Sequence, residues 1–84
     1  MRTTLKDIRM WLEDGKSKKD VTHMLVVCDT FDYEDYLVYV TKGQDVRERY
    51  FGEHGKNMQK VMEVYSLKKS LKKQLGERRA KNFD

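Results

Sequence analysis

The stretch from Cys28 to Tyr36 holds the residues of this 84-residue chain that are best suited to chemistry. It contains four carboxylates and three aromatic rings, and no basic residue lies among them. The acidic residues are Asp29, Asp32, Glu34 and Asp35, and the aromatic ones are Phe31, Tyr33 and Tyr36. Clustered carboxylates can bind a hard cation, whereas aromatic rings beside charged groups are typical of protein-binding hot spots.

The carboxylate spacing favours protein binding over metal binding. An EF-hand loop needs ligands at alternate positions and a glycine at its sharp turn, and this stretch has neither. Aspartate is also common in ordinary turns, so we expect no metal site and no cofactor. The predicted protein-binding residues are Asp29, Phe31, Asp32, Tyr33, Glu34 and Asp35. Their carboxylates would pair with a partner rich in arginine or lysine while the rings exclude water. The competing interpretation is a solvated turn whose Phe31 folds back onto the core. A metal-dependent hydrolase built on these carboxylates is the second alternative.

The histidines and the single cysteine do not predict catalysis. A nucleophilic thiolate needs an adjacent imidazole, but His23 and Cys28 are five positions apart on one predicted strand and should face opposite sides of it. His23 and His54 lack the further ligands that a structural zinc ion requires. We therefore predict no catalytic residues and a protein that is not an enzyme.

The positive charge of the chain is concentrated near its C-terminus. Residues 66–84 carry seven basic and two acidic residues, whereas residues 1–65 carry eleven basic and twelve acidic ones. Such a segment can bind the phosphate backbone without sequence preference. The residues for this alternative function are Lys68, Lys69, Lys72, Lys73, Arg78 and Arg79. No aromatic residue is interleaved with them, Phe83 stands alone, and no nucleic-acid-binding motif is present, so a solvated lysine face is the competing interpretation.

Hydrophobic patterns predict the elements that would position these residues. Thr4 and Asp7 resemble a capping box at the start of a helix, and Gly15 is placed to end that helix in a left-handed conformation. The apolar, β-branched run 21–28 predicts a strand that is central or covered on both faces, and the run 36–41 predicts a second strand of the same kind. These two strands would form a hairpin with the acidic-aromatic stretch at its tip.

The second half of the chain predicts two helices and a strand. Asp45 begins a second capping pattern, and the short helix after it should end between Gly52 and Gly55. Residues 58–65 fit a helix or a strand, and we favour a strand because a third strand stabilises a hairpin. Ser66 is placed to cap a last helix that carries Leu67, Leu71 and Leu75 and closes at Gly76.

The predicted order α-β-β-α-β-α defines an α+β fold, a small antiparallel sheet with helices packed on it. Residues 1–76 should form one domain, and residues 77–84 should form a charged, mobile tail. The chain start shows no signal peptide, and its longest uncharged run, 21–28, is too short to span a membrane. Cys28 should be a buried, reduced thiol, so we expect no membrane partner and a cytoplasmic location.

Two segments of the chain resemble a family of small phage and prophage proteins. They are residues 23–36, continued by Val38–Val40, and residues 55–65, and the resemblance extends over about residues 4–75. The family has no assigned activity, so the resemblance implies a phage-encoded accessory protein in the host cytoplasm and no catalytic residues. Leu37 stands where family members carry proline, which removes a bar to strand pairing at this position.

These observations together predict a phage-type accessory protein that binds a host protein through its hairpin tip. Because an acidic tip can occupy a basic groove meant for nucleic acid, a host nuclease or defence complex is the expected kind of target. A homodimer formed through a sheet edge stays open.

Overall fold

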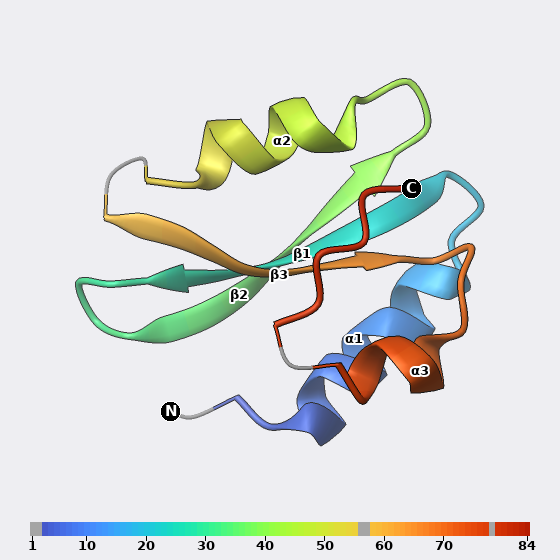
Figure 1. Ribbon diagram of the computed structural model, residues 1–84, viewed down its shortest axis with the longest axis horizontal. Coiled ribbons are helices and arrows are strands. Elements are labelled where there is room, and N and C mark those ends of the chain that lie inside the picture. The colour runs from blue at the N-terminus through green and yellow to red at the C-terminus, as the bar shows by residue number, and fades with distance from the viewer. Residues whose placement is uncertain (1–2, 56–57, 78) are drawn as a thin grey trace.

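The computed structural model describes residues 3–55, 58–77 and 79–84, which form three helices and a three-stranded sheet (Figure 1). The elements are α1 (Leu5–Lys16), β1 (Val21–Asp29), β2 (Glu34–Thr41), α2 (Val46–Glu53), β3 (Gln59–Ser66) and α3 (Leu71–Leu75). Both strand pairs are antiparallel, and the strands lie in the spatial order β2-β1-β3. This architecture confirms the predicted α+β fold and its order of elements.

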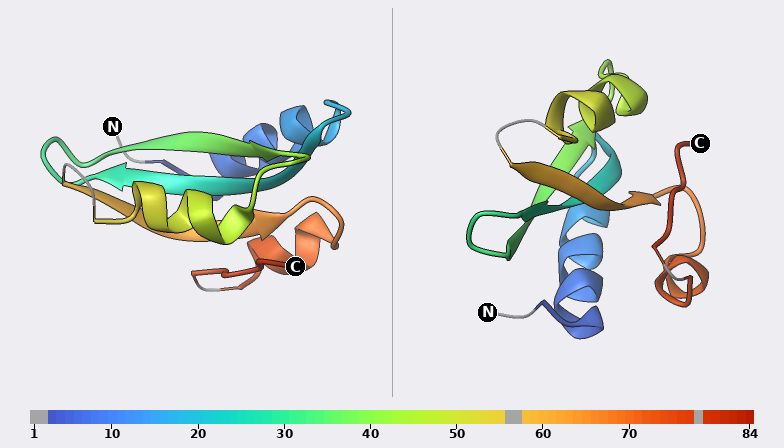
Figure 2. Two further views of the ribbon diagram at one scale, coloured as in Figure 1. Left: turned by 90° about the horizontal axis from the view of Figure 1, so that it is seen from above. Right: turned by 60° about the vertical axis from the view of Figure 1, so that its left-hand side comes forward.

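Hydrophobic side chains fill the space on both faces of the sheet. Helix α2 lies over one face, and α1 and α3 lie on the other (Figures 1 and 2). The core on the α1 side contains Ile8, Leu12, Met24, Val26, Tyr65, Leu67 and Ala80. The core on the α2 side contains Leu25, Val27, Val40, Val46, Val61 and Val64. Because β1 contributes buried residues to both cores, it is the central strand that its nearly continuous apolar run predicts.

An irregularity in β3 explains why residues 58–65 fit two patterns. The register between β1 and β3 shifts so that Val26 faces Glu63 while Val27 faces Val61. Met62 is thus the extra residue of a bulge, which puts Val61 and Val64 in the same core although they are three positions apart. A spacing of three mimics a helix in sequence, but the strand prediction is confirmed.

β2 is not a central strand, which is one of the two positions that its apolar run predicts. β2 pairs only with β1 and lies at the edge of the sheet, and its residues from Asp35 to Tyr39 are half-buried. Its residues still pack against both cores, with Leu37 and Tyr39 on the α1 side and Tyr36 and Val38 on the α2 side.

Helix α1 begins as predicted but ends differently. The capping box is formed: the Asp7 N–H donates to the Thr4 hydroxyl, and the Asp7 carboxylate accepts from the Thr4 N–H. Gly15, however, lies inside the helix, which continues to Lys16, so its predicted role as a left-handed terminator is wrong. A Cβ on Gly15 would lie 2.8 Å from Cε1 of Tyr39, so glycine at this position allows α1 and the Tyr39 ring to pack closely.

The last two helices confirm one predicted cap and correct another. Asp45 caps α2 by accepting from the N–H groups of Arg47 and Glu48. Ser66, in contrast, is the final residue of β3, and Ser70 caps the five-residue α3. No helix in the described part of the chain has the length and apolar character needed to cross a membrane.

The structure places residues 79–84 against the domain, where the sequence predicts a tail outside it. The Val64 N–H donates to the Ala80 carbonyl, and the Asn82 N–H donates to the Val64 carbonyl, so this segment adds a short bridge to the outer edge of β3. Ala80 is buried, and Phe83 packs against the core on the α2 side. A local charge pattern does not reveal this docking, because the partners of these residues lie far away in sequence.

Candidate functional site

The hairpin tip, residues 29–35, is a turn held by its own side chains. The Asp29 carboxylate accepts from the Phe31 N–H at 2.9 Å, and the Asp32 carboxylate accepts from the Glu34 N–H at 3.0 Å. The Tyr33 N–H donates to the Asp29 carbonyl at 2.7 Å, and Tyr33 has a φ of 58°, a left-handed conformation. Two of the four carboxylates therefore order the turn in addition to carrying charge.

A second contact joins the tip to the start of β3. The N–H and the hydroxyl of Thr30 both donate to the Met58 carbonyl, at 2.7 and 2.5 Å. These two hydrogen bonds join the hairpin loop to the residue that precedes β3. Sequence patterns did not identify Met58 as part of this surface, because residues 30 and 58 meet only through the β1–β3 pairing.

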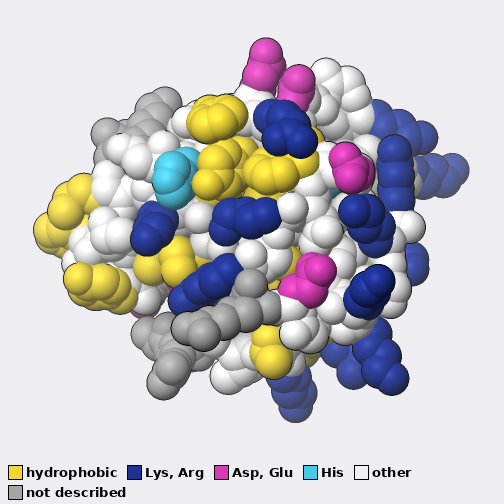
Figure 3. Space-filling view, viewed as in Figure 1, with side chains coloured by type: hydrophobic (Ala, Val, Ile, Leu, Met, Phe, Trp, Pro, Cys, Tyr) yellow, Lys and Arg dark blue, Asp and Glu magenta, His cyan; other side chains and the backbone are white. Residues whose placement is uncertain are grey.

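The aromatic residues of the tip project into solvent. Phe31 is 77% exposed, Tyr33 is 73% exposed and Met58 beside them is 58% exposed. Figure 3 shows hydrophobic side chains at the end of the molecule where the hairpin and the start of β3 lie, on its left. Phe31 therefore does not fold back onto the core. Three large side chains are therefore exposed at this end of the domain.

The predicted site residues are brought together, and their charge is concentrated. Asp32 and Glu34 are exposed, while Asp29 and Asp35 are half-buried. Within residues 3–55, 58–77 and 79–84, none of these carboxylates forms an ion pair with a basic side chain. Burial raises the pKa of the Cys28 thiol, and the carboxylate of Asp35 raises it further. The thiol thus stays protonated, although Cys28 is half-buried and not fully buried as predicted.

The side chains that could bind a metal ion or form a Cys-His pair have other surroundings in the described residues. In the part of the chain that the structure describes, no three His, Cys, Asp or Glu side chains converge as ligands would. His23 is buried, with its Nδ1 beside the Thr22 hydroxyl at 2.9 Å and its Nε2 facing the Asp84 carbonyl at 3.1 Å. Its partners are structural, and sequence patterns did not predict its contact with the C-terminal segment.

The predicted basic residues are partly engaged in ion pairs. Lys68, Lys69, Lys72 and Lys73 are exposed, but the Lys69 ammonium lies 3.6 Å from the Asp84 carboxylate. Arg79 pairs with Glu63, also at 3.6 Å. Because α3 is short, Lys68 and Lys69 lie in the connection before it, and Arg78 lies outside the described residues.

Tertiary packing creates an aromatic cluster that the sequence does not reveal. Tyr50 on α2 stacks on His54 with ring centroids 5.1 Å apart, and it contacts Phe83 edge-on at 5.3 Å. The Arg47 guanidinium lies 4.5 Å from the centre of the Phe83 ring. Phe83, which stands alone in sequence, is therefore part of a surface cluster with α2, beside the exposed Phe51.

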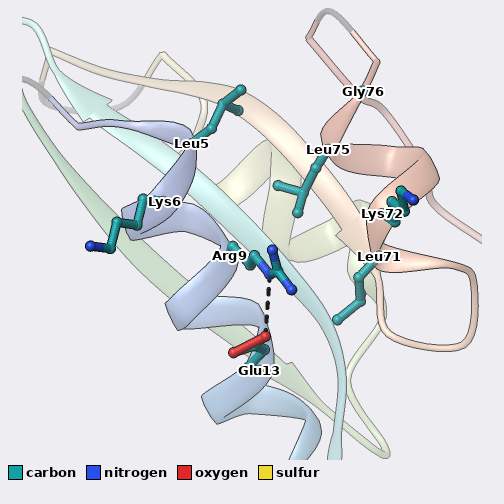
Figure 4. Close-up of a pocket in the computed structure, with 8 residues that line it drawn as sticks. All are labelled: Leu5, Lys6, Arg9, Glu13, Leu71, Lys72, Leu75 and Gly76. Atoms are coloured by element: carbon teal, nitrogen blue, oxygen red, sulfur yellow. Dashed lines mark hydrogen bonds and ion pairs between the residues drawn. The ribbon is translucent and has the colours of Figure 1, made fainter.

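An apolar groove separates α1 from α3 (Figure 4). Its volume is about 630 Å³, and Leu5, Leu71 and Leu75 supply its apolar surface. Lys6, Arg9 and Lys72 lie around it, and Arg9 pairs with Glu13 at 3.3 Å. Leucines of α1 and α3 thus line the same groove, and part of their apolar surface is open to solvent.

Comparison of the chain with family models, with curated proteins and with solved structures finds no match. The resemblance to small phage proteins stays a prediction, and the functional argument rests on the geometry of the site.

Proposed function

We propose that this protein is a non-enzymatic, phage-type accessory protein that binds a host protein through its hairpin tip. The observation that carries the proposal is the exposure of Phe31 and Tyr33 on a turn held by internal hydrogen bonds. A large apolar ring loses little conformational entropy on binding when its backbone is already ordered. Aromatic residues of this kind are the commonest anchors of protein interfaces.

The carboxylates of the tip define the chemistry of the partner. Asp32 and Glu34 are exposed beside the two rings, so the tip suits a surface that combines an apolar pocket with arginine or lysine. Complementary charges mainly accelerate encounter and select among partners, whereas buried rings slow dissociation. We therefore expect affinity to depend on Phe31 and Tyr33 and the association rate to depend on the carboxylates.

The narrower target that we propose is a host protein whose basic groove normally holds nucleic acid. An acidic, aromatic projection would compete with nucleic acid for such a groove, which makes a nuclease or a defence complex the suitable class. The resemblance of residues 23–36 and 55–65 to phage proteins supports this choice.

A capture experiment with matched variants tests the proposal. Phe31→Ala and Tyr33→Ala should each lose partners that the wild-type protein captures from host lysate, and Glu34→Gln should slow their association. Phe51→Ala is the control, because Phe51 is also 73% exposed but lies on α2. If the tip variants keep their fold and capture the same partners as the Phe51 variant, the tip is not the binding site.

Nucleic-acid binding is a second candidate, favoured by the exposure of Lys68, Lys72 and Lys73. Phosphate contacts release counterions, so binding through these residues should weaken steeply with salt. Replacing the three lysines with glutamine should abolish binding of labelled DNA or RNA at low salt. Binding that survives this replacement, or that is absent in the wild-type protein, would remove this candidate.

A further inference from the structure

At one edge of the sheet the backbone hydrogen-bonding groups are covered by other residues, and at the opposite edge they are not. The outer edge of β3 is covered, because Val64 exchanges hydrogen bonds with Ala80 and Asn82 and the Lys81 ammonium donates to the Met62 carbonyl. β2, at the opposite edge, pairs only with β1 (Figure 2). The described residues place no other strand beside it.

From Tyr36 to Thr41, β2 lacks the devices that usually prevent edge-to-edge pairing. Such edges are normally short, bulged, or interrupted by lysine, proline or inward-pointing charge. β2 has eight residues, and its register with β1 is regular from Val40 to Glu34. From Tyr36 to Thr41 it carries no charged residue and no proline.

Two hydrogen bonds identify which backbone groups of β2 point outward. The Lys42 N–H donates to the Asp20 carbonyl, on the β1 side, whereas the Thr41 N–H donates to the Gln44 side chain. Amide directions alternate along a strand, so Leu37 and Tyr39 share the outward direction of Thr41. Their N–H and C=O groups form the unpaired row of the edge.

We propose that β2 binds β2 of a second copy of this chain in antiparallel orientation, which joins two sheets into one of six strands. The charges at the ends of β2 select this partner and this register. Centring the twofold axis on Val38 places Glu34 of each copy opposite Lys42 of the other, and both residues are exposed. Opposite charges facing each other across an antiparallel pair are stabilising.

The same register brings the outward backbone groups into position. Leu37 of one copy faces Tyr39 of the other, so their N–H and C=O groups complete the ladder while Val38 faces its own copy. The half-buried side chains of these residues would then gain contacts on both faces of the sheet. The hairpin tips would lie at opposite ends of the joined sheet, with Phe31 and Tyr33 outside the paired segment. The contact therefore leaves the two aromatic rings of the tip available to another partner, whereas Glu34 belongs to both surfaces.

Proline and alanine at position 37 distinguish strand pairing from other self-association. Leu37→Pro removes an outward N–H and no bond to β1, so it should weaken self-association at least about tenfold, whereas Leu37→Ala keeps the N–H and should change it far less. Sedimentation equilibrium from about 5 to about 500 µM measures the association constant of each variant, and small interfaces require this range. Circular dichroism and thermal unfolding confirm that both variants fold.

Hydrogen exchange in the wild-type protein supplies a second readout that needs no variant. The amides of Leu37 and Tyr39 should exchange rapidly at low concentration and at least about tenfold more slowly at high concentration. The Val38 amide, which points toward β1, should be protected at both. A protein that is monomeric over the whole range would overturn the proposal. A dimer would also overturn it if Leu37→Pro and Leu37→Ala weakened it equally, or if the Leu37 and Tyr39 amides stayed unprotected.

Discussion

Replacing Gly15 with alanine is expected to destabilise the protein, although alanine is the better helix former. The new Cβ would lie 2.8 Å from Cε1 and 3.3 Å from Cζ of Tyr39, well inside the contact distance of about 3.5–4.0 Å between carbon atoms. The Tyr39 ring cannot swing away freely, because its hydroxyl donates to the Trp11 carbonyl at 2.6 Å.

The magnitude follows from two opposing contributions. Overpacking costs about 1–3 kcal/mol, and loss of the Tyr39 hydrogen bond would cost about 1 kcal/mol more. Replacing glycine with alanine inside a helix returns about 1 kcal/mol. We expect a net loss of about 1–3 kcal/mol in the free energy of unfolding, and a Tm lower by about 4–8 °C for each kcal/mol.

Gly52→Ala is the matched control within α2. A Cβ there would meet no atom within 4 Å, and its φ is not positive, so this variant should gain about 0.5–1 kcal/mol. Urea denaturation of both variants measures the difference. In a Tyr39→Ala background, where the ring is absent, Gly15→Ala should become stabilising. A Gly15→Ala variant as stable as the wild-type protein would refute the packing argument.

Three further predictions concern buried or docked groups. Gln74→Ala should lower the free energy of unfolding by about 2–3 kcal/mol, as measured by urea denaturation. The reason is that the Gln74 side chain accepts from the Ser66 N–H at 2.7 Å and donates to the Ser66 carbonyl at 2.8 Å. An unchanged midpoint would contradict this. Phe83→Ala should lower the free energy of unfolding by about 1–2 kcal/mol, because the ring packs against the core on the α2 side; an unchanged free energy of unfolding would contradict the docking of the C-terminal segment. Burial raises the pKa of Tyr65 to about 12 from its ordinary value of 10.0, so its contribution to stability is fully present below about pH 10 and is lost as the pH rises through 12. Phenylalanine has no hydroxyl to titrate, so between about pH 10 and 12 the Tyr65→Phe variant should lose up to about 2–3 kcal/mol less of its free energy of unfolding than the wild-type protein does. Equal losses in the two proteins over this pH range would rule this out.

Local sequence signals predicted the starts of α1 and α2 and the three strands. The Thr4 and Asp45 caps act within three residues, so they can be read without the rest of the chain. The nearly continuous apolar run of β1 likewise predicts a central strand, and the acidic-aromatic segment after it predicts the turn. Each of these features depends on neighbours in sequence.

Sequence patterns failed where the deciding contact is distant. Gly15 resembles a terminator, but it makes room for a ring that lies 24 positions later. Ser66 resembles a cap because serine suits helix starts. It is nevertheless a strand residue, because it pairs with His23 of β1 and its N–H donates to the Gln74 side chain. The Met62 bulge makes β3 hard to recognise in the sequence, because an extra residue interrupts the alternation of buried and exposed side chains that identifies strands.

By itself, the sequence determined that this chain forms an α+β domain with an acidic, aromatic turn between two strands, because hydrogen bonds and hydrophobic periodicity within a few residues fix such elements. Only the tertiary structure decided that Met58 joins the hairpin tip, that Phe83 returns to α2, and that one sheet edge is covered while the other is open. These outcomes depend on strand order and on contacts between residues far apart in sequence. No local pattern encodes them, since their stabilisation arises only when the whole core forms.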